Sequence, residues 1–405
     1  MIGRKTIATV GVVALAAGVS SVGPTASAGH AAISIQVGAQ LGDRNLPAEG
    51  MRFYGPESIT VHTGDRITFS FQGFHTATML PAGVGADDWL HDNARSPASG
   101  GYAFAQSDFD DGPEEFKDNF PAVATPTDPS CGTGDQAPCS YTGDSVLNSG
   151  APLEAGDTFT ATVNAPAGST FWVVCLVHHH MRLRVKVVDD PASATPQSAI
   201  DQARNQQIAR DADWAAATHA KFSDRRTSHR TASGRRVWDA WAGVDSRYVS
   251  LFDFYPHNLT IQKGDTVRWR FDHLVLEDHT VSMPVPQMFN NLRFDEPMCD
   301  PDGDDGTAPD TQPSFDEQTG EPTCPEGSVL EFDVSHDFWG GTGNGRFTGG
   351  RDVEHSGIRG TQARAITPPA AGEGSFDVRF PEETGRRGVT YICFLHPMEG
   401  RIHVN

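Results

Sequence analysis

Thiol, imidazole and thioether side chains gather in two short segments of this chain. Residues 175–181 read CLVHHHM, and residues 393–398 read CFLHPM. A thiolate, an imidazole and a thioether held in one loop form a donor set that soft copper prefers. The two segments therefore predict two mononuclear copper sites in one polypeptide.

A further donor lies far upstream of each loop. Electron-transfer copper sites use two imidazoles and one thiolate in a trigonal arrangement, with a weak thioether on the axis. Each loop supplies one histidine, and a second one stands in HTATM at 75–79 or in HTVSM at 279–283. The predicted ligand sets are His75, Cys175, His178 and Met181 in the first half, and His279, Cys393, His396 and Met398 in the second. Met79 and Met283 are predicted to pack in the core, because methionine fills irregular interiors well.

The ligand sets belong to a longer internal repeat. FYGPESITV at 53–61 returns as FYPHNLTI at 254–261, and TGDRITF at 63–69 returns as KGDTVRW at 263–269. The HT motifs follow, then a pair of cysteines, then SVL at 145–147 and at 328–330, and the donor loop comes last. Landmarks repeated in one order at so long a period indicate duplication of a whole domain rather than a repeat array.

Both halves resemble the cupredoxin family, the plastocyanin-like blue copper proteins, in these His, Cys, His and Met residues. The resemblance covers nearly all of the chain after residue 28 apart from a connector and long loops. The first loop, Cys-x2-His-x2-Met, is similar to the short ligand loop of amicyanin-type members. The resemblance implies two Greek-key β-sandwiches, each with a type 1 copper site near one end.

Two departures from the family pattern leave questions open. The second loop resembles Cys-x-x-His-Pro-x-Met-x-Gly but is one residue shorter, so it is open whether the Met398 sulfur reaches the axial position. The first loop has three consecutive histidines. The expected spacing from Cys175 selects His178 over His179 or His180.

Short alternating segments such as residues 59–62, 67–71 and 266–271, punctuated by Gly-Asp turns, read as strands and predict an all-β fold. Residues 198–225 are rich in Ala, Gln, Arg and Asp and predict a helix, whereas 225–236 read as exposed linker. Residues 81–143, 296–325 and 340–360 read as irregular loops. The predicted domains are a signal peptide at 1–28, a first cupredoxin domain at 29–190, a helical and flexible connector at 191–236, and a second cupredoxin domain at 237–405.

The first 28 residues have the order of a secretory signal. Arg4 and Lys5 precede an apolar run at 7–19, and TASA at 25–28 offers a small-residue cleavage site. The apolar run is too short and too interrupted by glycine for a membrane anchor. We therefore expect a secreted or extracytoplasmic protein with no membrane span after signal removal.

Six cysteines in an exported chain suggest disulfides. Cys131 and Cys139 lie close together in one loop, and Cys299 and Cys324 flank another, so each couple is predicted to form a bridge. That pairing leaves Cys175 and Cys393 free as ligands. The alternative bridge between those two would leave both His/Met loops unexplained.

The charge balance bears on partners. The chain has 52 acidic and 31 basic residues and a net charge of −21, which makes nucleic acid an improbable partner. An acidic surface can steer basic redox proteins at a range set by ionic strength. The sequence does not indicate which redox partner protein it meets, or an oligomeric state.

Electron transfer is the predicted function, and two alternatives stay open. Nitrite reductases and small laccases are also built from cupredoxin domains, but they place a histidine directly beside the ligand cysteine. Here Val174 and Leu176 flank one cysteine, and Ile392 and Phe394 flank the other, which argues against a copper oxidoreductase. Copper sequestration or delivery is the other alternative, favoured by the additional histidines in the first loop.

Overall fold

The structure is a computed structural model of the chain. It describes residues 30–43, 45–93, 125–151, 154–178, 180–271, 277, 279–285, 296–300, 314–315, 322–325, 328–333, 341–349, 352–357, 359 and 374–405. The predicted signal peptide and His179 lie outside these residues.

The first half folds into a β-sandwich because its strands bury alternate side chains. In β4 (Arg66–Phe71) the apolar residues Ile67, Phe69 and Phe71 point inward, and β10 (Arg182–Val188) follows the same alternation. One face of the sandwich contains β2 (Ala48–Tyr54), β1 (Ala32–Gln40), β4, β8 (Thr158–Val163) and β6 (Cys139–Tyr141) in that order. The other face contains β3 (Ser58–His62), β10, β9 (Thr170–Val174), β5 (Thr78–Met79) and β7 (Leu147–Asn148).

The second half repeats this arrangement. One face contains β13 (Val249–Tyr255), β12 (Arg236–Ser246), β15 (Thr266–Phe271) and β22 (Gly374–Arg379). The other contains β14 (Asn258–Ile261), β24 (Glu399–Val404), β23 (Val389–Ile392), β16 (Ser282–Met283) and β21 (Glu354–His355). The predicted all-β fold of two sandwiches is confirmed.

Antiparallel pairing of β2 with β13 joins the two halves into one ten-stranded sheet, in which Glu49 lies opposite Ser250. The strands on either side of this pair correspond one to one: β1 to β12, β4 to β15, and β8 to β22. Each half can therefore be compared with the other position by position.

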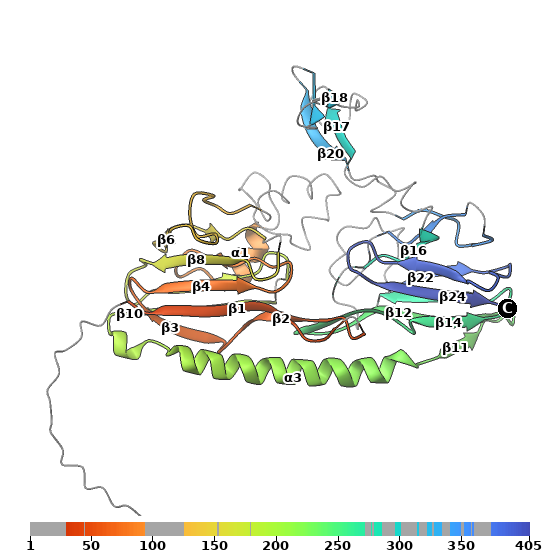
Figure 1. The fold of residues 1–405 in the computed structure, drawn as a ribbon, viewed down its shortest axis with the longest axis horizontal. Coiled ribbons are helices and arrows are strands. Elements are labelled where there is room, and N and C mark those ends of the chain that lie inside the picture. Colours follow the sequence, from red (N-terminus) through yellow and green to blue (C-terminus); the bar gives the residue numbers. More distant parts are fainter. Residues whose placement is uncertain are drawn as a thin grey trace, which may run out of the picture.

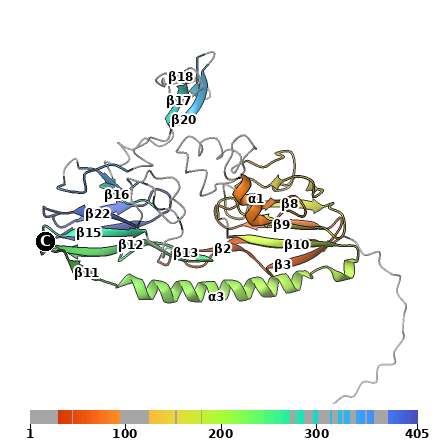
Figure 2. The same ribbon diagram turned by 180° about the vertical axis from the view of Figure 1, so that it is seen from behind.

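Helix α3 (Gln197–Ser223) lies along both sandwiches and packs against β1, β2 and β13 (Figure 1; Figure 2). Equivalent tyrosines of the two halves bond to it. The hydroxyl of Tyr54 donates to Asp211 at 3.0 Å, and that of Tyr255 lies 3.0 Å from Nδ1 of His219. Phe222, near the end of the helix, packs edge-on to Trp241. The predicted helical connector is thus a strap across the junction of the two halves.

The structure differs from the sequence-based expectations in four segments. Residues 227–230, expected in the linker, form β11 (Thr227–Arg230), which pairs with β12. The loop expected at 296–325 contains β17 (Glu296–Asp300), β18 (Ser314–Phe315) and β19 (Pro322–Thr323). The loop expected at 340–360 contains β21. The loop expected at 81–143 contains helix α1 (Ala86–Asn93) and β6.

One landmark of the repeat was matched wrongly. The SVL at 328–330 enters β20 (Val329–Asp333), which pairs with β17 apart from the sandwiches (Figure 1). The structural counterpart of Leu147 is instead Glu354, because β7 pairs with β5 as β21 pairs with β16. A three-residue match carries too little information to reveal this.

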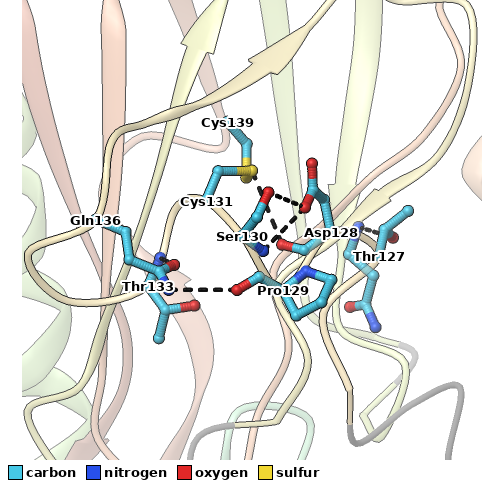
Figure 3. Close-up of a disulfide and its surroundings, with 9 residues drawn as sticks. Thr127, Asp128, Pro129, Ser130, Cys131, Thr133, Gln136 and Cys139 are labelled. Atoms are coloured by element: carbon cyan, nitrogen blue, oxygen red, sulfur yellow. Dashed lines mark hydrogen bonds between the residues drawn. A yellow bond between two sulfur atoms is a disulfide. The ribbon is translucent and has the colours of Figure 1, made fainter.

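Both predicted disulfides are confirmed. Cys131 bonds to Cys139 at the start of β6, in a loop that Asp128 tightens by accepting hydrogen bonds from the main chain and hydroxyl of Ser130 (Figure 3). Cys299 in β17 bonds to Cys324. Cys175 and Cys393 are free and buried. Among the described helices, none combines the length and apolar character needed to cross a bilayer.

Candidate metal centres

The structure brings three of the predicted first-half ligands together. Nδ1 of His75 lies 3.0 Å from Nδ1 of His178, and the latter lies 3.7 Å from Sγ of Cys175. All three side chains are buried. They come from three places: the segment before β5, the end of β9 and the loop that follows β9.

The second half assembles the same group. Nδ1 of His279 lies 3.1 Å from Nδ1 of His396, and Sγ of Cys393 lies 3.8 Å from the first and 4.0 Å from the second. His279 and Cys393 are buried, and His396 is partly exposed.

These donors fit a copper ion. A triangle with the three sides of the second group has its centre about 2.1 Å from each corner, close to metal–nitrogen and metal–sulfur bond lengths. Two imidazoles and one thiolate are soft and borderline donors, a set suited to copper. Both histidines of each group present the same nitrogen, Nδ1, to the shared space.

Main-chain hydrogen bonds hold each sulfur in place. The amides of Thr76 and Thr280 donate to the sulfurs of Cys175 and Cys393, both at 3.3 Å. The hydroxyls of the same threonines accept from the amides of the residues that follow the cysteines, at 2.8 and 2.9 Å. Behind these, Thr78 bonds to Asn148 in the first half and Ser282 lies 2.7 Å from His355 in the second. The upstream strand is thereby tied to the donor loop in both halves.

The two predicted axial methionines occupy equivalent positions. The register of β9 with β10 pairs Val174 with Arg182, and that of β23 with β24 pairs Ile392 with Glu399. The amides of Cys175 and Cys393 donate to the carbonyls of Met181 and Met398 at 3.2 and 3.1 Å. The residue missing from the second loop therefore shortens only the turn between histidine and methionine. Both methionine side chains are buried in the core that contains the cysteines.

A glycine in a β-bulge makes room for each upstream histidine. Gly38 in β1 and Gly243 in β12 have φ of +72° and +83°, and both lie where the strand register shifts. A Cβ on Gly38 would lie 2.4 Å from Nε2 of His75, and one on Gly243 would lie 2.5 Å from Nε2 of His279. Both positions require glycine for its conformation and for its lack of a side chain.

Carboxylates surround the first group. Oε1 of Glu49 accepts from Nε2 of His75 at 2.9 Å, and Oε2 of Glu277 pairs with Nε2 of His178 at 3.3 Å. Burial lowers the pKa of both histidines, but their bonds to the carboxylates and to Cys175 outweigh it and raise the pKa overall. Burial likewise raises the pKa of Cys175, yet the two imidazoles hold it well below its ordinary value. Burial would raise the pKa of Glu277, but the charge of His178 lowers it to about 2.

The second group has an aromatic neighbour, and no described carboxylate bonds its imidazoles. The ring of Phe252 stacks on His396 with centroids 4.3 Å apart, and within the described residues Nε2 of His279 has no hydrogen-bond partner. Burial lowers the pKa of His279 well below its ordinary value and that of His396 to about 4. Burial raises the pKa of the Cys393 thiol. The pKa shifts therefore favour charged imidazoles and a thiolate in the first group, and uncharged side chains in the second.

The remaining histidines have other positions. The ring of His180 lies 6.4 Å from that of His178 and is partly exposed, so it stands beside the first group rather than in it. His30, His62 and Asp65 also cluster. Both oxygens of Asp65 accept main-chain amides at 2.7 Å, and its counterpart Asp265 caps the same turn without histidines. Asp65 therefore has a structural role. Met79 and Met283 are buried in the core, as expected.

Sequence reasoning missed Glu49, Glu277, Gly38, Gly243 and the two threonines. The glycines could have been found by extending the repeat upstream, where a glycine interrupts equivalent strands, and the threonines lie in the HT motifs. The repeat gives no indication of Glu49 or Glu277, because neither is a glutamate in both halves. The counterpart of Glu49 is Ser250, and that of Glu277 is Gly73.

No protein-family model matches the chain, and no curated protein sequence does. Solved structures give remote likenesses. Auracyanin A, a "blue" copper protein from Chloroflexus aurantiacus, is 19% identical and covers 39% of this chain and 99% of its own, with a TM-score of 0.19. The blue copper oxidase of Nitrosomonas europaea is 12% identical over 93% of this chain and 86% of its own, with a TM-score of 0.18. The copper nitrite reductase of that organism is 10% identical over 93% and 94%, with a TM-score of 0.18.

Likenesses at these TM-scores are too remote to carry a conclusion about function. The chain's own strand order and donor groups are more informative. By these, the chain is a tandem pair of β-sandwiches that resemble the cupredoxin fold, each with a candidate copper centre.

Proposed function

We propose that this chain is a secreted electron-transfer protein with one type 1 copper site in each half. The observation that supports this most strongly is the duplicated group of two Nδ1 atoms and one Sγ atom, built from equivalent residues in both sandwiches. Bound copper would supply a one-electron couple at each group. His75, Cys175 and His178 would hold the first ion, and His279, Cys393 and His396 the second, with Met181 and Met398 as candidate thioether donors.

The protein would hold the ligand atoms of each site in a fixed geometry. The Thr76 and Thr280 amides orient the sulfurs, and the loop-closing bonds from each cysteine to its methionine set the length of the turn. Donors held in one geometry change little when an electron arrives or leaves, so the reorganisation that accompanies transfer is small. Such rigidity is what a carrier needs.

One imidazole gives access to the surface. His396 is partly exposed and is flanked by Leu395, an exposed large apolar side chain with 40% of its surface accessible. An electron can pass between the second group and a docked redox protein through this ring. The two disulfides are consistent with an oxidising compartment outside the cytoplasm, which the proposed signal peptide would provide.

The test is a redox titration of the copper-loaded mature protein, followed by visible and electron paramagnetic resonance spectroscopy. A carrier shows two type 1 signals that cycle reversibly without turnover of oxygen or nitrite. A type 2 signal with turnover would identify a copper oxidoreductase. Tight binding of Cu(I) without facile cycling would identify a protein for sequestration or delivery.

A further inference from the structure

Two carboxylates, those of Glu49 and Glu277, both bond imidazoles of the first donor group. Glu49 comes from β2 in the first half and bonds His75, whereas Glu277 comes from the second half and bonds His178. Each contacts the Nε2 atom, on the far side of the ring from the Nδ1 that faces the sulfur. Both carboxylates therefore act on the imidazoles without competing for the metal position.

The residues two positions before His75 and His279 explain why both carboxylates bond the first donor group. Gly73 stands two residues before His75, and a Cβ there would lie 1.6 Å from Oε1 of Glu49. The glycine thus leaves the space through which Glu49 reaches the ring. The equivalent position in the second half, two residues before His279, holds Glu277 itself, whose side chain crosses to the first half.

Among the described residues, no carboxylate bonds an imidazole of the second group, which Glu49 and Glu277 influence only at longer range. The strand position equivalent to Glu49 holds Ser250, as the pairing of β12 with β13 shows. Phe252 covers the ring of His396, and Nε2 of His279 has no hydrogen-bond partner in the part of the chain that the structure describes. Among the described residues, the imidazoles of the second group therefore lack the direct carboxylate contacts that those of the first group have.

We propose that Glu49 and Glu277 lower the reduction potential of the first copper site below that of the second. This inference rests on the proposed function, because it needs a copper ion in each group. An imidazole that donates its Nε2 proton to a carboxylate is a more basic ligand. The nearby negative charge also stabilises the more highly charged Cu(II) state over Cu(I). The imidazoles of the second group have no such direct contact among the described residues, so Cu(II) is stabilised less there.

The difference in reduction potential favours electron transfer from the first site to the second. One electron leaves the first site and one enters the second, with no proton or other reactant involved. Glu277 also provides a short connection, because it bonds His178 and is only two residues from His279 along the chain. An electron that enters at the first site thus settles on the second, beside the accessible edge of His396.

The test uses variants that isolate each site. Cys393→Ser leaves the first site and Cys175→Ser leaves the second, so the midpoint potential of each can be measured by spectroelectrochemistry. We expect the first site to have the lower potential. In the Cys393→Ser background, Glu49→Gln and Glu277→Gln should each raise the first potential by at least a tenfold change in the Cu(II)/Cu(I) ratio, about 59 mV for one electron.

Control variants distinguish the loss of negative charge from structural disruption of the site. Glutamine keeps the size and an acceptor oxygen, and the two carboxylates come from different elements, so each variant tests the proposal independently. Glu382→Gln removes an exposed carboxylate that pairs with Lys263 and should shift neither potential. In the Cys175→Ser background, Glu49→Gln and Glu277→Gln should shift the potential of the second site. Each shift should be smaller than the shift that the same variant causes at the first site in the Cys393→Ser background.

Two results would overturn the proposal. A first-site potential equal to or above the second would do so, as would Gln variants that leave the gap unchanged. In both cases two blue chromophores would still be present, and the proposed electron carrier would stand. Absence of a type 1 chromophore from either single-site variant would instead refute the proposed function and this inference together.

Discussion

Oε2 of Glu277 lies 3.3 Å from Nε2 of His178, so a residue of the second sandwich bonds a candidate metal ligand of the first. Both side chains are buried. The paired strands β2 and β13 and the strap formed by α3 hold the two sandwiches in the register that this contact needs. The two centres are thus linked by packing as well as by sequence, and their properties can be tested separately.

The Glu277 contact predicts a pH-dependent contribution to stability. Its pKa is about 2 in the folded protein against an ordinary 4.5, so the carboxylate stabilises the metal-free fold fully above about pH 4.5. The contribution, on the order of 3 kcal/mol, is lost as the pH falls from 4.5 towards 2. Urea unfolding of wild type and Glu277→Gln should show a stability gap at pH 6 that narrows at pH 4 and pH 3. A gap that stays constant would show that the carboxylate is not ionised through this contact.

The two cysteines should differ in ionisation. The imidazoles lower the pKa of Cys175 well below the ordinary thiol value, whereas burial raises that of Cys393. At neutral pH, metal-free Cys393→Ser should show the ultraviolet absorbance of one thiolate, and metal-free Cys175→Ser should show none until the pH is raised. Equal absorbance in the two variants would contradict the charge difference between the sites.

Substitution of either bulge glycine should affect only the copper site in its own half. Gly38→Ala would place a Cβ 2.4 Å from Nε2 of His75, so copper should be lost from the first site and retained by the second. Gly243→Ala should show the reverse. Gly83→Ala is the matched control, because Gly83 has φ of +84° with nothing within 4 Å of the added atom. It should cost about 1–2 kcal/mol of backbone strain and keep both coppers. If Gly83→Ala also lost copper, backbone strain rather than the histidine contact would be responsible.

The two predicted axial methionines should behave alike. Strand register places Met398 where Met181 stands in the first half, despite the shorter loop. Removing a weak thioether donor destabilises Cu(II), so Met181→Leu and Met398→Leu should each raise the potential of their own site. Spectroelectrochemistry of the single-site variants measures both. No shift for Met398→Leu, alongside a clear shift for Met181→Leu, would show that the shortened loop excludes the second sulfur.

Patterns of residue type were enough to predict the fold and the candidate ligands. The alternation in residues 67–71, the Gly-Asp turns and the duplicated HT and CxxH motifs each report a local preference or a spacing, and these survive in the sequence. Burial at every second residue confirmed the strands, and the segregation of cysteines into two close couples predicted both disulfides.

The features that escaped prediction depend on tertiary contacts. Glu277 is one acidic residue among 52, and nothing near it in sequence indicates that it faces His178 of the other sandwich. Residues 354–355 form β21 because β16 offers an edge to pair with, not because of their own strand preference. Residues 227–230 likewise become a strand by pairing along β12.

The most direct test of the account is the copper content of the purified mature protein and of its two cysteine variants, measured together with their visible spectra. Independent sites predict two coppers per chain in the wild type, and one each in Cys175→Ser and Cys393→Ser, with a blue chromophore remaining in both variants. A single copper in the wild type, or loss of all colour from either variant, would contradict it.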